Sequence, residues 1–180
     1  MVSKDLKGTL PALPAPGKIR WTTLVEADIP DLLVSNPALR EEDIRRWAAD
    51  GQECTVARLG PTLVHYLWEA SRPVYLPYLG RTLKLVDGDR CTTAVFTHPA
   101  FRNRGLYAAS SVRALHEARR RGFVRMLGLA EWWNAPALHV MQDIAGRHVV
   151  GVVGYWQLGP WRLLYGRGGV RLGEDITLSV

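Results

Sequence analysis

The sequence predicts a single α/β domain in which helices flank a central mixed sheet of about six or seven strands. Two observations lead to this fold class. The first half contains short segments rich in β-branched and aromatic residues, separated by turns with glycine or proline, as in an antiparallel meander. The second half runs from a strand through a helix to another strand, and such a crossover produces a parallel pair of strands. The 180 residues suffice for one substantial core.

Composition is that of a globular chain, with 47% apolar and 22% charged residues. No apolar run reaches the length of about eighteen residues that a membrane span needs, and the N-terminus lacks the apolar core of a signal peptide, so we expect a cytoplasmic protein without a membrane partner. Cys54 and Cys91 lie far apart and fit neither a disulfide framework nor a metal site, so no metal is expected. The net charge of +6 favours anionic partners without choosing among them.

The first third of the chain predicts a leader, a strand and two helices. Residues 1–17 are rich in proline and lack periodicity, which predicts a flexible leader before a domain over 18–180. A strand and a short helix follow in 18–35, and the helix begins near Asp28 with Pro30 in its first turn. A second helix is expected from an Asn36 cap to Gly51.

Four strands are expected next. Residues 53–59 and 62–70 form a hairpin signal around Gly60-Pro61, and residues 81–99 contain two further strands that turn at Asp87-Gly88. The proline-broken connection 72–80 lies between these pairs and is expected to be a loop.

The second half gives a clear order of elements. A helix is expected over 106–122 because apolar positions recur at helical spacing and Gly122 ends it. A buried strand follows in 124–134, then a short helix over 135–146, and then two strands in 148–166 that turn at Gly159-Pro160.

The loop before the long helix has the chemistry of a diphosphate site. A helix N-terminus presents unpaired N–H groups and the positive end of its dipole. Gly105 removes a side chain that would block the approach, and Arg102 and Arg104 can add charge-assisted hydrogen bonds. A solvated helix cap is the alternative for an isolated loop, but the strand before it and the helix after it favour an anion site.

These segments resemble the GCN5-related N-acetyltransferases. Residues 102–107 match the family's Arg/Gln-x-x-Gly-x-Gly/Ala loop except for Tyr107, and Asn134 matches a position that contacts the cofactor arm. The resemblance implies that acetyl-CoA or another acyl-CoA is the co-substrate and that a small-molecule or peptide amine accepts the acyl group. It assigns cofactor binding to Val95, Phe96, Thr97, Arg102, Asn103, Arg104, Gly105, Leu106, Tyr107 and Asn134.

The implied reaction is direct attack of a neutral amine on a thioester, which needs a base, an N–H for the oxyanion and an acid for the thiolate. The backbone N–H of Val95 or Phe96 could stabilise the oxyanion. Family members often carry the acid as a tyrosine seven residues after the asparagine, where this sequence has Met141. The remaining candidates for the acid are His139, Tyr155 and Tyr107.

Glu131 and His98 are the leading candidates for the base. The resemblance implies a gap where two parallel strands separate, and Glu131 lies on the strand that borders it, whereas His98 ends the strand that would bind the cofactor arm. Glu69 is a third candidate. Each also has a structural alternative as a surface residue, a turn residue or an ion-pair partner of Arg72. The predicted catalytic residues are therefore Glu131, His98 and His139.

Two other function classes stay open. The basic cluster of the long helix and its exit could bind nucleic acid, although no nucleic-acid motif accompanies it. The absence of the usual tyrosine also suits a protein that binds coenzyme A without catalysis. The apolar C-terminal strands could pair across a homodimer. The arginines of the cluster are Arg113, Arg119, Arg120, Arg121 and Arg125.

Overall fold

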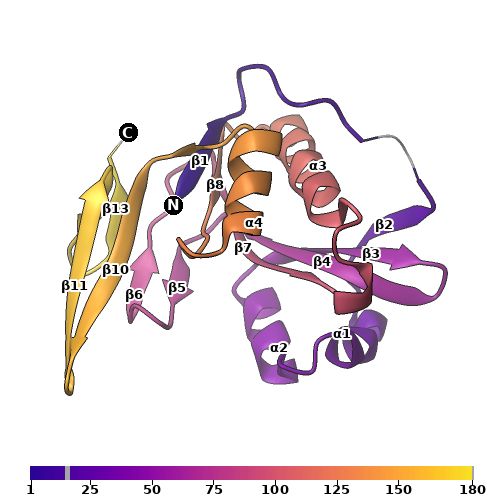
Figure 1. Cartoon of the computed structure of the whole chain (residues 1–180), viewed down its shortest axis with the longest axis horizontal. Coiled ribbons are helices and arrows are strands. Elements are labelled where there is room, and N and C mark those ends of the chain that lie inside the picture. Colours follow the sequence, from indigo (N-terminus) through magenta and orange to yellow (C-terminus); the bar gives the residue numbers. More distant parts are fainter. Residues whose placement is uncertain (15–16, 180) are drawn as a thin grey trace.

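The computed structural model describes residues 1–14 and 17–179, and its main feature is a central sheet of seven strands in the order β2-β3-β4-β7-β8-β1-β9 (Figure 1). Only β7 and β8 are parallel, and the other neighbours are antiparallel. This confirms the predicted mixed sheet. In that order the strands are Ile19–Thr23, Glu53–Leu59, Thr62–Ala70, Asp89–Thr97, Arg125–Gly128, Val2–Asp5 and His148–Val149.

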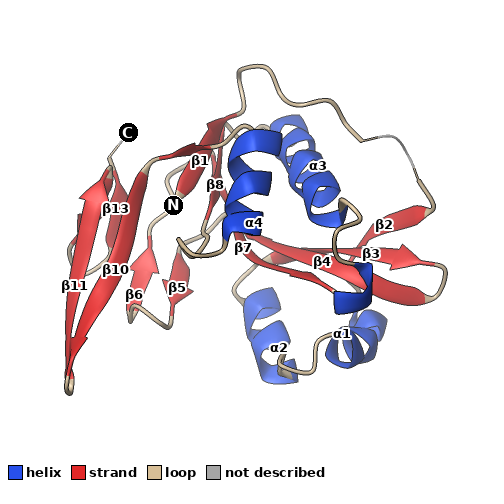
Figure 2. Cartoon of the chain, viewed as in Figure 1, coloured by secondary structure: helices blue, strands red, loops and turns tan. Residues whose placement is uncertain are grey.

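Helices cover both faces of the sheet (Figure 2). On one face, Leu32 of α1 and Ile44 of α2 are fully buried in a cluster with Trp68 of β4. On the other, Leu115 of α3 packs in a cluster with Met126 of β8. The helices are α1 (Ile29–Ser35), α2 (Glu41–Ala49), α3 (Leu106–Arg120) and α4 (Ala135–His139), which continues as a π-helical turn (Val140–Ile144).

The expected helix starts agree with the structure for α1 and α3, but the expected start of α2 is too early. Asn36 ends α1 instead of starting α2, and its side-chain amide donates to the Tyr66 hydroxyl at 2.8 Å. The second helix begins at Glu41, where three acidic residues occupy the first turn and favour the positive end of the helix dipole. No helix in the described part of the chain is long and apolar enough to cross a membrane.

The prediction of a flexible leader over 1–17 is wrong at its start, because Val2–Asp5 form β1 inside the central sheet. Val2 pairs with Gly128 of β8 and with Val149 of β9. Val2 and Leu6 are each only 1% exposed, and the Leu6 N–H donates to the Val124 carbonyl at 2.9 Å. Buried apolar area, rather than local propensity, holds this segment in place. Residues 15 and 16 of the predicted leader lie outside the described residues.

A second sheet in the order β12-β13-β6-β5 packs beside the central one, and the hairpin of β10 and β11 extends from it (Figure 1). The expected hairpin around Asp87-Gly88 is wrong, because β6 pairs with β5 and β13 instead of β7. The hairpin around Gly159-Pro160 is confirmed, with Leu158 opposite Trp161. The strands are β5 (Val74–Leu76), β6 (Arg81–Leu83), β10 (Gly151–Leu158), β11 (Trp161–Gly168), β12 (Val170–Leu172) and β13 (Ile176–Leu178).

Candidate active site

The site lies where the two parallel strands separate. Their pairing ends at Thr92 opposite Gly128, and β7 then continues to Thr97 with no strand on that edge. The free edge forms one wall of a groove of about 820 Å³ that α3 and α4 complete on the other sides. Backbone groups on such an edge can pair with an extended ligand as a further strand would. Val95 and Thr97, which the sequence assigns to this role, both line the groove.

A bulge in β7 sits at the same point. Trp68 of β4 pairs with Ala94, whereas the next residue, Glu69, pairs with Thr92, so Thr93 is the extra residue of the bulge. A bulged residue is left outside the regular ladder and locally re-aims the backbone. The Thr93 side chain donates to the Gln52 side-chain carbonyl at 2.7 Å. Thr93 lines the groove, although no local pattern in the sequence predicts a bulge there.

The loop between β7 and α3 turns twice through the left-handed region. Asn103 has φ 59° and Gly105, the N-cap of α3, has φ 72°. Alternation of this kind turns successive N–H groups toward one side and makes a concave anion site. A Cβ added at Gly105 would meet no atom within 4 Å, so the loop is open there. These observations fit a diphosphate at the predicted position.

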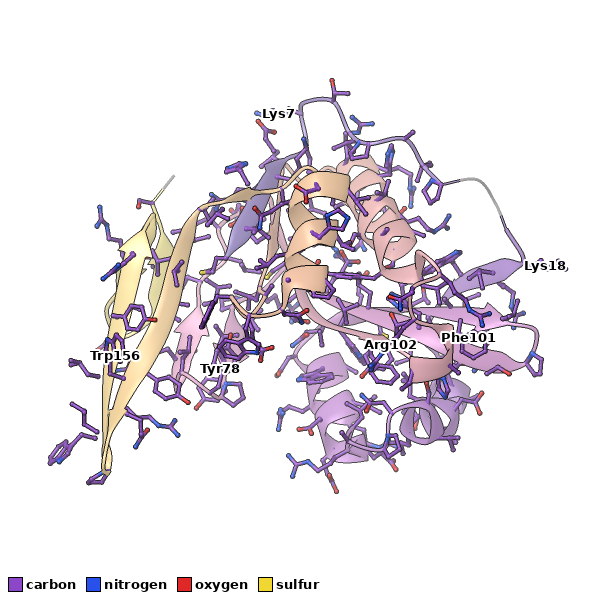
Figure 3. The ribbon with its side chains drawn as sticks, viewed as in Figure 1. Lys7, Lys18, Tyr78, Phe101, Arg102 and Trp156 are labelled. Carbon is purple, nitrogen blue, oxygen red and sulfur yellow. The ribbon has the colours of Figure 1, made fainter. Side chains whose placement is uncertain are left out.

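The two arginines of the loop differ in their roles. The Arg102 side chain lines the groove, and its Nε–H donates to the Thr97 carbonyl at 3.2 Å, which ties the loop to the end of β7. Figure 3 shows Arg102 and Phe101 side by side there. Arg104 lies over the Phe101 ring, with 5.2 Å between its guanidinium carbon and the ring centroid, and does not line the groove.

Asn134 lines the groove, and its side-chain oxygen also accepts from the Ala137 N–H at 3.2 Å as the cap of α4.

Tyr107 also lines the groove. Burial raises the pKa of its phenol, and Arg147 and Ser111 oppose that shift. The phenol is therefore held protonated near Arg147.

Arg147 marks the point where the strands separate. Its guanidinium is 3% exposed and donates to the Leu127 carbonyl at 3.2 Å and to the Thr92 hydroxyl at 3.4 Å. Gly128 leaves room for it, because a Cβ there would lie 2.4 Å from a guanidinium nitrogen. No local sequence pattern marks Arg147 as part of the site, so sequence reasoning missed it.

A second, smaller pocket of about 500 Å³ meets the groove at the same place. Thr93, Leu129, Ala130 and Glu131 line both spaces. Of the residues predicted as candidates for the base, Glu131 is the one that lies at this junction. The outer part of the pocket is formed by the β10–β11 hairpin, the β5–β6 turn and α4.

Several predicted residues lie elsewhere. His98 does not line the groove: its ring accepts from the Ala100 N–H at 3.3 Å and packs edge-on against Phe101. His139 is exposed on α4 and bonds to Asp143 at 2.7 Å. The Phe96 ring stacks on Tyr66 on the opposite side of the strand, because side chains alternate along β7.

The remaining candidates for the base and the basic cluster are held in internal contacts. Glu69 is buried and pairs with Arg90 rather than Arg72, and its burial raises the pKa of the carboxyl. Each arginine of the cluster contacts a partner within the chain. Arg113 lies over Trp21, Arg119 bonds to the Gly8 carbonyl, Arg120 pairs with Glu117, Arg121 with Glu53 and Arg125 with Asp89.

Comparison with known proteins identifies the fold. No protein-family model matches the sequence, and no curated protein matches it significantly. Solved structures match by shape. A transcriptional regulator from Bacillus halodurans C-125 is 19% identical with a TM-score of 0.54, and the match covers 69% of this chain and 90% of that one.

Two acetyltransferases match in the same way. AAC(6')-Iy in complex with a bisubstrate analogue built on coenzyme A is 14% identical with a TM-score of 0.55, covering 78% of this chain and 98% of that one. The ribosomal-protein-S18-alanine N-acetyltransferase from Escherichia coli is 11% identical with a TM-score of 0.52, covering 69% and 75%. The chain therefore has the fold of these N-acetyltransferases, which confirms the α/β fold that the order of elements predicted and the resemblance to the GCN5-related N-acetyltransferases implied.

Proposed function

We propose that this protein is an N-acyltransferase that moves an acetyl or related acyl group from acyl-CoA to an amine. One observation supports this above all others: the free edge of β7 leads from the doubly left-handed loop to the point where the strands separate, and a carboxylate lies there. This order matches the diphosphate, the extended arm and the thioester of acyl-CoA. The matched acetyltransferases, one of them bound to a coenzyme A analogue, support the same assignment.

In the proposed reaction Glu131 accepts a proton from the substrate ammonium, directly or through water, and the neutral amine attacks the thioester carbonyl. The carbon–sulfur bond then breaks as the amide forms. The N–H of Thr93, freed from the ladder by the bulge, is our candidate for the oxyanion donor in place of Val95 or Phe96. Tyr107 is our candidate for the acid that protonates the departing thiolate, since it is the phenol that lines the described groove.

The test replaces the glycine of the loop. Gly105→Val forces a β-branched side chain into a left-handed conformation that such residues avoid, and we expect the Kd for coenzyme A to rise at least tenfold. Gly60→Val is the matched control, because Gly60 has φ 59° and open space but lies in the β3–β4 turn. Calorimetric titration of both variants measures the difference. Equal Kd values for the two would refute the diphosphate site.

The alternative of a coenzyme A-binding protein without catalysis rests on Met141, which is buried in the groove at the position of the usual tyrosine. Thiol release with an amine panel separates the two functions, since both bind coenzyme A but only the enzyme releases the thiol. The cytoplasmic location stays a prediction.

A further inference from the structure

The smaller pocket has a distinctive lining. Its walls are almost entirely apolar or aromatic, and none of its lining residues in the described part of the chain is a lysine or an arginine. Glu131 is the carboxylate of the lining, and the terminal amine of Met1 is tied to the Gly151 carbonyl at 2.7 Å. The aromatic residues of the wall are Tyr78, Trp132, Trp133, Tyr155 and Tyr165.

The aromatic residues come from three separate parts of the chain. Tyr78 lies on the β5–β6 turn, and Figure 3 shows it between the β10–β11 hairpin and the body of the central sheet. Trp133 precedes α4, and Tyr165 belongs to β11. Gly154 is the residue that lets Tyr165 lie across β10, because a Cβ there would meet the Tyr165 hydroxyl oxygen at 2.7 Å. The pocket is thus shaped by packing between distant elements.

The charge of the pocket lining favours amines with one positive charge over polyamines. A single carboxylate can pair with a single ammonium, whereas a polycation would leave its other charges against an apolar wall at a high desolvation cost. Aromatic faces attract a cation and also cover apolar area. The volume of about 500 Å³ falls within the usual range for small-molecule sites, about 300 to 1,000 Å³.

We infer that the acceptor is a small monoamine with an apolar or aromatic body, whose nitrogen sits at Glu131 and whose body fills the pocket. This inference rests on the proposed function and names its substrate class. It also separates this chain from AAC(6')-Iy, an aminoglycoside N-acetyltransferase that it resembles in fold, because aminoglycosides carry several amines.

The experiment compares acceptors with the full chain and acetyl-CoA. Thiol release is measured with 2-phenylethylamine and tryptamine, with the small polar amine ethanolamine, and with the polyamine neamine. We expect kcat/KM for 2-phenylethylamine to exceed the values for ethanolamine and neamine at least tenfold. A preference for neamine, or equal values for 2-phenylethylamine and ethanolamine, would overturn the inference.

Binding separates this inference from the proposed function. Titration of the coenzyme A-saturated chain with 2-phenylethylamine and with neamine ranks the two ligands even if no amine is acylated. Tighter binding of 2-phenylethylamine would keep the inference when catalysis is absent, and tighter or equal binding of neamine would reject it. Failure of the chain to bind coenzyme A would reject the proposed function instead.

Two tyrosines of the same small sheet provide matched variants. Tyr78 lines the pocket and is 52% exposed, whereas Tyr75 is 61% exposed and lies outside the lining. Tyr78→Ala should raise KM for 2-phenylethylamine at least fivefold and leave KM for acetyl-CoA unchanged. Tyr75→Ala should change neither. Equal effects of the two substitutions would show that Tyr78 does not contact the acceptor.

Discussion

Tyr107 is the residue at which this chain departs from the family loop, and we propose it as the acid of the reaction. Its phenol lies near Arg147, which itself bonds across the point where β7 and β8 separate. Burial raises its pKa, so the group stays protonated at neutral pH and can donate. Tyr107→Phe should lower kcat about 10²-fold, the lower end of the range for a general acid, with the Kd for coenzyme A unchanged.

The rival donor provides the comparison for Tyr107. Tyr155 lines the smaller pocket rather than the groove. Tyr155→Phe keeps the aromatic ring and should therefore leave kcat unchanged. Steady-state kinetics with a small amine measure both variants. If Tyr155→Phe lost kcat and Tyr107→Phe kept it, Tyr155 would be the proton donor.

His65 shows how a buried residue ties the site to its scaffold. Ser110 donates to the Tyr107 carbonyl at 3.0 Å, so its oxygen accepts from His65 Nε2–H at 2.8 Å, and Nδ1 accepts from the Thr97 hydroxyl at 2.8 Å. This arrangement suits the neutral ring. Burial lowers the pKa of His65 to about 3. The residue links β4, the end of β7 and α3.

The lowered pKa predicts how stability changes with pH. Unfolded histidine binds a proton near its ordinary pKa of about 6.5. Folded His65 binds one only near 3, so between these values the unfolded chain holds more protons. The unfolding free energy should be independent of this group above about pH 6.5 and fall below it by up to about 1.4 kcal/mol per pH unit. Urea unfolding from pH 7.5 to 4.5 measures the slope.

The control isolates His65 from the acidic groups that also lose their ion pairs in acid. Glu53 is one of these, because Arg121 and Arg90 lower its pKa to about 2. Since such groups are the same in both chains, the difference between wild type and His65→Gln reports His65 alone. The variant should show a shallower slope, and the exposed His148→Gln should keep the wild-type slope. Identical slopes for wild type and His65→Gln would contradict the prediction.

At the scale of elements, Leu6, which directly follows strand β1, gives the clearest stability test. Leu6 packs with Leu115 and Met126, so Leu6→Ala should cost about 2–5 kcal/mol of unfolding free energy through lost burial and a cavity. Leu13 lies in the same N-terminal segment but is 52% exposed, and Leu13→Ala should stay within about 0.5 kcal/mol of wild type. Denaturant unfolding measures both. Similar small losses would mean that β1 does not hold the sheet in solution.

The elements also show what a sequence can and cannot predict. The loop around Gly105 and helix α3 were predictable because local chemistry determines them: a glycine cap, a basic loop and a helical apolar stripe. Strand β1 and the pairing of β6 with β13 were not, since each depends on partners more than eighty residues away in the chain. Arg147 and the bulge at Thr93 arise in the same way from tertiary packing. His98 and His139 lie outside the groove lining for a related reason, because their position near the site in the sequence does not fix the direction of their side chains.

At the scale of the whole molecule, the β10–β11 hairpin presents an unusual apolar face. Trp156 pairs with Leu163, and Leu158 with Trp161, on one side of the two strands, and all four are between 62% and 78% exposed. Figure 3 shows Trp156 on this hairpin, at one end of the molecule. Large aromatic residues bury roughly 150–250 Å² each, so two facing hairpins approach the roughly 1,200 Å² of a small specific interface.

We propose that a second copy of the chain covers this face, as the apolar C-terminal strands suggest. Light scattering after gel filtration should then give twice the chain mass of 20.1 kDa. Trp161→Glu places a charge on this face and should give the mass of one chain, because an unpaired buried charge opposes association. Val34→Glu is the control, since Val34 is 80% exposed on α1 and distant from the hairpin. A wild-type mass of 20.1 kDa at micromolar concentration, or a dimer that Trp161→Glu leaves intact, would exclude this interface.

The base of the same hairpin lines the smaller pocket. Loss of the dimer should therefore also raise KM for 2-phenylethylamine, while the Kd for coenzyme A stays unchanged.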